Sequence, residues 1–137
     1  MKKALKILAA AVSMSLAVLT PASAAPEEET VSNAYLHLDG AMDEWAAAPA
    51  LRLPSSYHGG HLDSWNNSVI YDDALVIIAY ANRKDNADSL ERAKNMGDAF
   101  LQMQAKDPIG DGRVRNSYGP ENLFDADGVP NILSTGT

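Results

Sequence analysis

A mostly apolar run between Ser68 and Asn82 constrains the fold of this chain more than any other feature. From Ala74 onward, apolar side chains occupy every direction around a helical wheel. Such a helix needs protein on all sides, because each large apolar side chain left in water forgoes roughly 1.5–3 kcal/mol. A buried strand over 74–81 is the alternative, but the length of the run favours a helix over 68–82.

A second helix is predicted from Asp88 to about Lys106. Asp88 and Glu91 have the spacing of a capping box, in which two side chains satisfy free amides of the first turn. The proline at 108 ends the helix, because the residue before a proline avoids helical geometry. The residues expected on its packing face are Leu90, Ala93, Gly97, Phe100, Leu101 and Gln104.

The polar connection at 83–86 is short, which predicts an antiparallel helical hairpin. We expect Gly97 to let the two helix backbones approach closely. One amphipathic partner covers only one side of the first helix, so the far side should remain an apolar patch. The chain is therefore expected either to self-associate through that helix or to be part of a larger helical protein.

The regions on either side of the hairpin carry weaker patterns. Residues 25–54 are expected to be irregular, with one weakly alternating strand at 34–38 and a turn at Asp39-Gly40. Residues 109–137 are rich in glycine and proline and show no helical periodicity. About 30 residues without regular structure are uncommon inside a compact domain, which indicates a functional surface or an incomplete domain.

The N-terminus has the three parts of a secretory signal peptide. Lys2, Lys3 and Lys6 precede an apolar stretch at 7–19, and a small-x-small site follows at 22–24. A membrane anchor is the weaker alternative, because spanning a bilayer takes about 20 apolar residues. We expect residues 1–24 to be removed and the protein to be secreted or periplasmic, with no membrane association after cleavage.

Charge and cysteine content exclude several classes of protein. The chain has 137 residues, no cysteine and a net charge of −7, and loss of residues 1–24 removes three lysines and no acid, leaving −10. No disulfide, thiolate zinc site or lipid-modified cysteine is therefore expected. The acidic balance argues against a nucleic-acid partner, since such binding needs clustered Lys and Arg.

Several motifs, in order, resemble the opening of secreted bacterial six-hairpin glycosidase-like proteins. The first lies at 55–65, Ser-Ser-Tyr-His-Gly-Gly-His-Leu-Asp-Ser-Trp, and Val-Ile-Tyr-Asp-Asp-Ala-Leu follows at 69–75. An Arg-Ala pair at 92–93 with Asp-Ala at 98–99, and the loop Asp-Gly-Arg-Val-Arg-Asn-Ser-Tyr at 111–118, complete the likeness.

The resemblance implies a fold and a function. The fold class is mainly α: one antiparallel helical hairpin of an incomplete (α/α)6 toroid, with an irregular N-terminal segment and a C-terminal loop. The domain division is a signal peptide at 1–24, an irregular segment at 25–54 and a partial six-hairpin domain at 55–137. The function implied is that of an exported fragment of a glycoside hydrolase-like protein, with carbohydrate as a partner. A complete toroid has six hairpins, so the fragment is expected to be inactive by itself, and its status as an enzyme stays open.

A second resemblance supports a rival function. The stretch at 38–45, Leu-Asp-Gly-Ala-Met-Asp-Glu-Trp, is similar to the first strand and turn of some β-sandwich carbohydrate-binding modules. The rival is a non-catalytic secreted protein that binds a carbohydrate or another protein.

Candidate site residues follow from the six-hairpin resemblance and from sugar chemistry. Asp72 matches the family pattern and is the catalytic candidate. Neighbouring Asp73 is more simply explained as favourable charge at a helix N-terminus. The expected substrate-binding residues are Asp63, Trp65, Tyr71 and Arg115, since aromatic faces stack on sugars while charged groups bind hydroxyls.

No metal site or cofactor is predicted. His58 and His61 lie in a glycine-containing loop and supply too few ligands for zinc. The acidic residues of the C-terminal loop do not have EF-hand spacing.

We predict that the exported protein begins near Ala25, because the basic, apolar and small-residue regions occur in the order that signal peptidases recognise. N-terminal sequencing of protein recovered outside the cytoplasm tests this expectation. Recovered protein that still begins at Met1 would contradict it.

Overall fold

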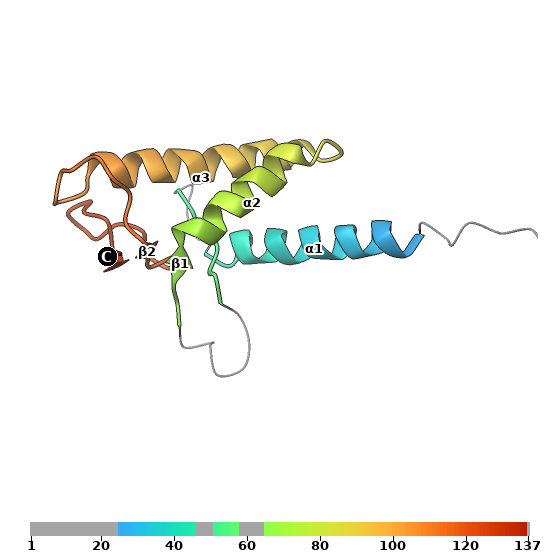
Figure 1. Cartoon of the computed structure of the whole chain (residues 1–137), viewed down its shortest axis with the longest axis horizontal. Coiled ribbons are helices and arrows are strands. Elements are labelled where there is room, and N and C mark those ends of the chain that lie inside the picture. The colour runs from blue at the N-terminus through green and yellow to red at the C-terminus, as the bar shows by residue number, and fades with distance from the viewer. Residues whose placement is uncertain (1–24, 46–50, 58–64, 137) are drawn as a thin grey trace, which may run out of the picture. The chain divides into compact units, whose positions relative to one another are not determined.

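The computed structural model describes residues 25–45, 51–57 and 65–136, and these are mainly helical with one small sheet (Figure 1). The expected signal peptide, Asp63, His58 and His61 lie outside the described residues. The chain divides into compact units at 1–32 and 33–137. The packing described below belongs to the second unit.

Helix α1 spans Ala25–Asp43, so the expectation of an irregular segment, with a strand at 34–38, is wrong. Its last turns bury Met42 and pack Tyr35 and Leu38 against the core. These three residues follow helical spacing, i, i+3 and i+7, which places them on one face. The apolar and polar alternation at 34–38 is therefore part of a helical pattern that is too short to identify by itself. Gly40 lies within α1 and not in a turn.

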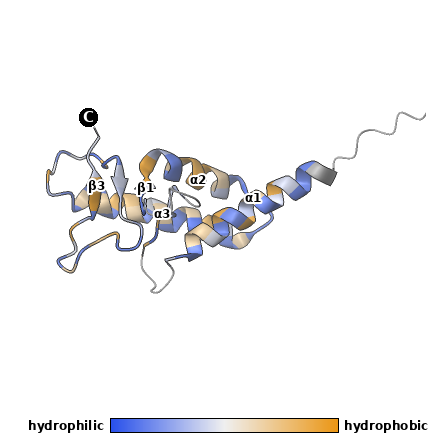
Figure 2. Ribbon diagram, turned by 90° about the horizontal axis from the view of Figure 1, so that it is seen from below, coloured by the Kyte–Doolittle hydropathy of each residue, from blue (hydrophilic) through white to orange (hydrophobic). Residues whose placement is uncertain are grey.

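Helices α2 (Ile70–Asn82) and α3 (Ala87–Ala105) form the predicted hairpin, and Figure 1 shows α3 running back past α2. Figure 2 shows α2 largely in hydrophobic colours, with a hydrophilic stretch near its start. Residues 68 and 69, expected in the helix, instead form strand β1 (Ser68–Val69).

The N-cap of α3 is Asn86, and the predicted capping box at Asp88 is wrong. The Asn86 side chain accepts a hydrogen bond of 2.9 Å from the backbone N–H of Asp88. Asp88 lies inside the first turn, where its charge complements the helix dipole. The cap is thus two residues earlier than the sequence pattern indicates.

The buried face of α3 is rotated from the expected one. Leu90 and Leu101 are 63% and 64% exposed, although both were expected to pack. A Cβ at Gly97 would meet no atom within 4 Å, so close approach of α2 does not require this glycine. The buried residues of α3 are Ser89, Ala93, Met96, Ala99 and Met103. Methionines fill part of the space that the branched side chains were expected to fill.

The C-terminal segment contains two strands, which corrects the expectation that it lacks regular structure. β2 (Ser117–Tyr118) pairs antiparallel with β1 and with β3 (Ile132–Ser134). Tyr118 is fully buried and joins the core. The sheet therefore ties the loop after α3 to the start of α2.

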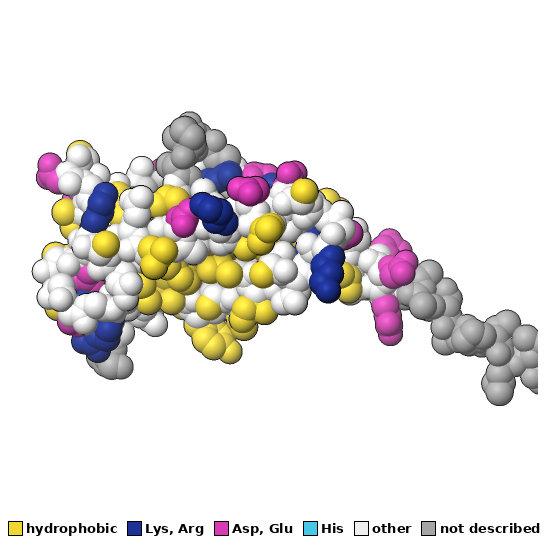
Figure 3. All heavy atoms as spheres, turned by 90° about the horizontal axis from the view of Figure 1, so that it is seen from above, with side chains coloured by type: hydrophobic (Ala, Val, Ile, Leu, Met, Phe, Trp, Pro, Cys, Tyr) yellow, Lys and Arg dark blue, Asp and Glu magenta, His cyan; other side chains and the backbone are white. Residues whose placement is uncertain are grey.

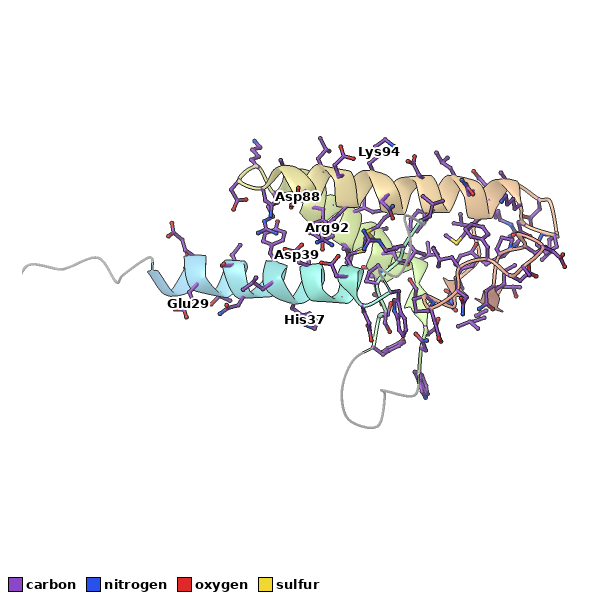
Figure 4. All side chains as sticks on the ribbon, turned by 180° about the vertical axis from the view of Figure 1, so that it is seen from behind. Glu29, His37, Asp39, Asp88, Arg92 and Lys94 are labelled. Atoms are coloured by element: carbon purple, nitrogen blue, oxygen red, sulfur yellow. The ribbon has the colours of Figure 1, made fainter. Side chains whose placement is uncertain are left out.

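Ion pairs join α1 to α3, and in Figure 4 Asp39 and Arg92 face each other across the two helices. Arg92 donates two hydrogen bonds of 2.8 Å to Asp43. The hydrogen bond from Arg92 lowers the pKa of Asp43. Arg83, which follows α2, binds Asp39 at 3.0 Å, so residues from two other parts of the chain fix the C-terminal half of α1.

The two alternative caps of α3 can be separated by mutation. We expect Asn86→Ala to lower the free energy of unfolding by about 1 kcal/mol, because a free N–H of the first turn loses its acceptor. Asp88→Asn is the control and should change stability by a few tenths of a kcal/mol. Urea denaturation measures the free energy of unfolding of both variants. A larger loss of stability for Asp88→Asn than for Asn86→Ala would show that Asp88 caps the helix.

Candidate pocket at the start of α2

The catalytic candidate Asp72 lies in a cavity of about 350 Å³ beside the first turn of α2. Three segments supply its walls: the C-terminal half of α1, residues 54–56, and α2. In Figure 4, His37 projects from the side of α1 opposite Asp39. The described lining residues are His37, Leu38, Ala41, Pro54, Ser55, Ser56, Asp72, Asp73 and Val76.

Asp73 is the most unusual group of this pocket. Its side chain is fully buried, and one carboxyl oxygen, Oδ2, accepts a hydrogen bond of 2.7 Å from the Ser68 hydroxyl. The other oxygen, Oδ1, has no hydrogen-bond partner among the described residues. Burial raises the pKa of Asp73 to about 7, the charge of Asp72 adds to the rise, and the Ser68 hydrogen bond opposes it. Asp73 therefore holds a proton in weakly acidic solution.

Asp72 and Asp73 differ because their environments differ. Asp72 is half-buried, while the burial of Asp73 disfavours its charged form. A buried carboxyl group with a raised pKa, such as Asp73, is typical of functional sites, and structural groups also show such shifts. The pocket combines these groups with hydroxyl, imidazole and aliphatic surfaces.

Hydrogen bonds between neighbouring segments hold the walls of the pocket in place. The backbone N–H of Val69 donates to the Ser56 hydroxyl at 2.9 Å, and the Ser56 N–H donates to the Asn67 carbonyl at 2.9 Å. The N–H of Ile70 donates to the Asn116 carbonyl at 3.0 Å. The segment at 54–56 and the start of α2 are thus fixed to each other and to the sheet.

The expected aromatic residues do not line this pocket. Trp65 is 57% exposed and makes an edge contact with Tyr57, their ring centroids 5.7 Å apart. Tyr71 is 72% exposed. Asp63 lies outside the described residues. Of the predicted site residues that the structure describes, Asp72 lines this pocket, and Trp65, Tyr71 and Arg115 do not.

Arg115, expected to bind substrate, is buried and paired within the protein. Its guanidinium donates to Asp107 and, at 2.8 Å, to Asp111. The backbone N–H of Arg115 donates to the Tyr118 hydroxyl at 2.8 Å. These contacts assign Arg115 the role of fastening the loop after α3 to the core.

Sequence reasoning did not assign the polar residues His37, Ser55 and Ser56 to this pocket, nor the apolar residues that line it. It treated Asp73 as a helix-terminus charge alone. The helical spacing of Tyr35, Leu38 and Met42 was the available signal, because a helix there places 37, 38 and 41 on adjoining sides.

No protein-family model, curated protein or solved structure matches this chain. Within residues 25–45, 51–57 and 65–136, no cluster of three or more metal-binding side chains occurs. The helices of this same part of the chain include none long and apolar enough to cross a membrane.

The raised pKa of Asp73 makes stability depend on pH. Between its unfolded value of 3.8 and about 7, the folded state keeps a proton that the unfolded state has lost. Stability should therefore fall as pH rises through this window, by up to about 1.4 kcal/mol per pH unit, and level off above it. We expect Asp73→Asn, which stays neutral and can still accept from Ser68, to remove this decline. Urea denaturation from pH 4.5 to 8 measures it, and parallel profiles for the two proteins would contradict the assignment.

Proposed function

We propose that this chain is an exported, carbohydrate-processing protein of the six-hairpin glycosidase-like kind, in which residues 55–137 include one hairpin of an (α/α)6 toroid. The observation that carries the proposal is that Asp72 and Asp73 line one pocket at the start of α2. The motif resemblance supports the family, and the α2–α3 hairpin supports the fold. The secreted or periplasmic location rests on the signal-peptide pattern.

The chemistry of the pocket suits a sugar. The carboxylate of Asp72 can accept hydrogen bonds from ligand hydroxyls. Leu38, Ala41 and Val76 add aliphatic surface, which suits the C–H groups of a sugar ring. The same pocket disfavours an anionic ligand, because the carboxylate of Asp72 would repel it.

The pocket is better suited to binding a sugar than to hydrolysing it. Glycoside hydrolysis uses two carboxyl groups about 5–9.5 Å apart on opposite sides of the scissile bond. Asp72 and Asp73 are adjacent in one helix turn, so their side chains leave the helix about 100° apart and on the same end. Among the described residues, the pocket contains no further acid. We therefore infer that this chain alone binds sugar without turnover.

One observation favours a second candidate, a secreted protein-binding module. Tyr71, Leu75 and Ile78 are 72%, 50% and 56% exposed along one side of α2. Large apolar side chains grouped on a surface are typical of protein interfaces. This candidate does not use the pocket, so sugar binding separates the two.

The test measures sugar binding and turnover by the purified processed protein. Titration calorimetry with a panel of neutral oligosaccharides should detect a ligand, and Asp72→Ala should weaken its binding at least 10-fold. Asp127→Asn, which neutralises an exposed acid of the C-terminal loop, is the control and should leave binding unchanged. No reducing ends should be released during prolonged incubation.

Two outcomes would contradict the proposal. Failure of every sugar to bind at millimolar concentration would remove the carbohydrate function and favour the protein-binding candidate. Robust release of reducing ends, abolished by Asp72→Ala, would show that this chain catalyses hydrolysis without further carboxyl groups.

A further inference from the structure

The α2–α3 hairpin leaves one apolar side exposed, which we call the hairpin face: Tyr71, Leu75 and Ile78 on α2, with Leu90, Gly97 and Leu101 on α3. The five large side chains are between 50% and 72% exposed. Figure 3 shows hydrophobic side chains gathered over these two helices. None of the six residues lines the candidate sugar pocket.

The spacing on each helix forms a straight seam. On α2, the steps from Tyr71 to Leu75 and from Leu75 to Ile78 are four and three residues. On α3, the steps from Leu90 to Gly97 and from Gly97 to Leu101 are seven and four residues. These steps keep side chains on one side of a helix and are those of packed helix pairs in bundles. The opposite sides carry the core, with Asp73 and Tyr80 of α2 and Met96 of α3 fully buried.

Gly97 provides an independent observation. Glycine inside a helix is less favourable than alanine, so a reason for it is expected. The part of the chain that the structure describes supplies none, since a Cβ at this position would meet no atom within 4 Å. A glycine between exposed Leu90 and Leu101 allows a helix from outside the chain to approach closely.

We propose that the hairpin face binds a second copy of this chain, two hairpins packing about a twofold axis into a four-helix bundle. The exposed fractions of the five side chains add up to about three whole side chains per copy, which is roughly 300 Å² of large apolar surface at about 100 Å² for each side chain. Two copies bury about 600 Å² of large apolar side chain and further area from the atoms around the face, which is the scale of a small interface that dissociates on dilution. The bundle covers the side of α2 that the monomer leaves in water.

Sedimentation velocity on the purified chain between 1 and 200 µM tests the dimer. The wild type should be dimeric at the upper end and dissociate on dilution. Ile78→Lys should weaken dimerisation at least 100-fold, because a charge would be buried without a partner. The matched control is Ile109→Lys, since Ile109 in the C-terminal loop is 57% exposed against 56% for Ile78, and it should dimerise like the wild type.

Gly97 variants distinguish an interface from a folding defect. Gly97→Ala should raise the thermal midpoint of the monomer, because the open position accepts a Cβ and alanine favours the helix. The same change should weaken dimerisation at least 10-fold, and Gly97→Leu should abolish it while cooperative unfolding is kept. Stabilisation of the fold combined with loss of the dimer is a result that a merely structural role does not produce.

The outcomes that overturn the proposal are specific. A monomer at 200 µM, with or without binding of a hydrophobic dye, would show that a second copy does not cover this face. A dimer that survives both Ile78→Lys and Gly97→Leu would place the interface elsewhere. Assemblies larger than two would exclude the closed twofold bundle. Sugar binding is unaffected by any of these results, so this proposal and the proposed function fail separately.

Discussion

The structure depends on helix α2, which has apolar side chains on two sides, only one of which is buried among the residues that the structure describes. Tyr80 lies in the core, while Ile78 two residues earlier is more than half exposed. The other elements are arranged around the buried side. Tyr35 of α1 donates a hydrogen bond of 3.0 Å to the Ala79 carbonyl, and α3 contributes Met96 to the same core. The pocket therefore lies on the buried side of α2, and the hairpin face lies on its exposed side.

The pocket arises because a polar residue occupies a core position of that helix. Asp73 shares the buried side with Tyr80, so its carboxyl group must either find partners or keep a proton. The Ser68 hydroxyl supplies one hydrogen bond to this carboxyl group. Burial raises the pKa of Asp73, so the group keeps its proton in weakly acidic solution. Such an arrangement costs stability at neutral pH, which an apolar residue would not. The neighbouring Asp72 adds further hydrogen-bond acceptors to the pocket.

How far the sequence predicts the structure differs by region. The α2–α3 hairpin was predictable because the apolar run and the proline after Asp107 are strong local signals. The 25–43 helix was not, since the residues that pack, such as Tyr35 and Met42, are separated by polar ones and Gly40 is a poor helix former. The sheet could not be foreseen because β1 and β2 have two residues each and pair across some 50 positions.

The candidate site was predictable only in part. Asp72 was selected by its motif, whereas the pocket around it needs α1 to be helical. Arg115 has the right chemistry for a ligand, but only the fold reveals Asp107 and Asp111 beside it.

If α2 buries one side within the chain and offers the other to a second copy, its two adjacent isoleucines should respond differently to dilution. Methyl NMR of the two adjacent isoleucines during dilution tests it most directly. Ile77 is partly buried against the core and Ile78 is exposed. The account predicts that the Ile78 methyl resonances move with protein concentration, while those of Ile77 change far less. Resonances of Ile78 that stay fixed from 1 to 200 µM would contradict it.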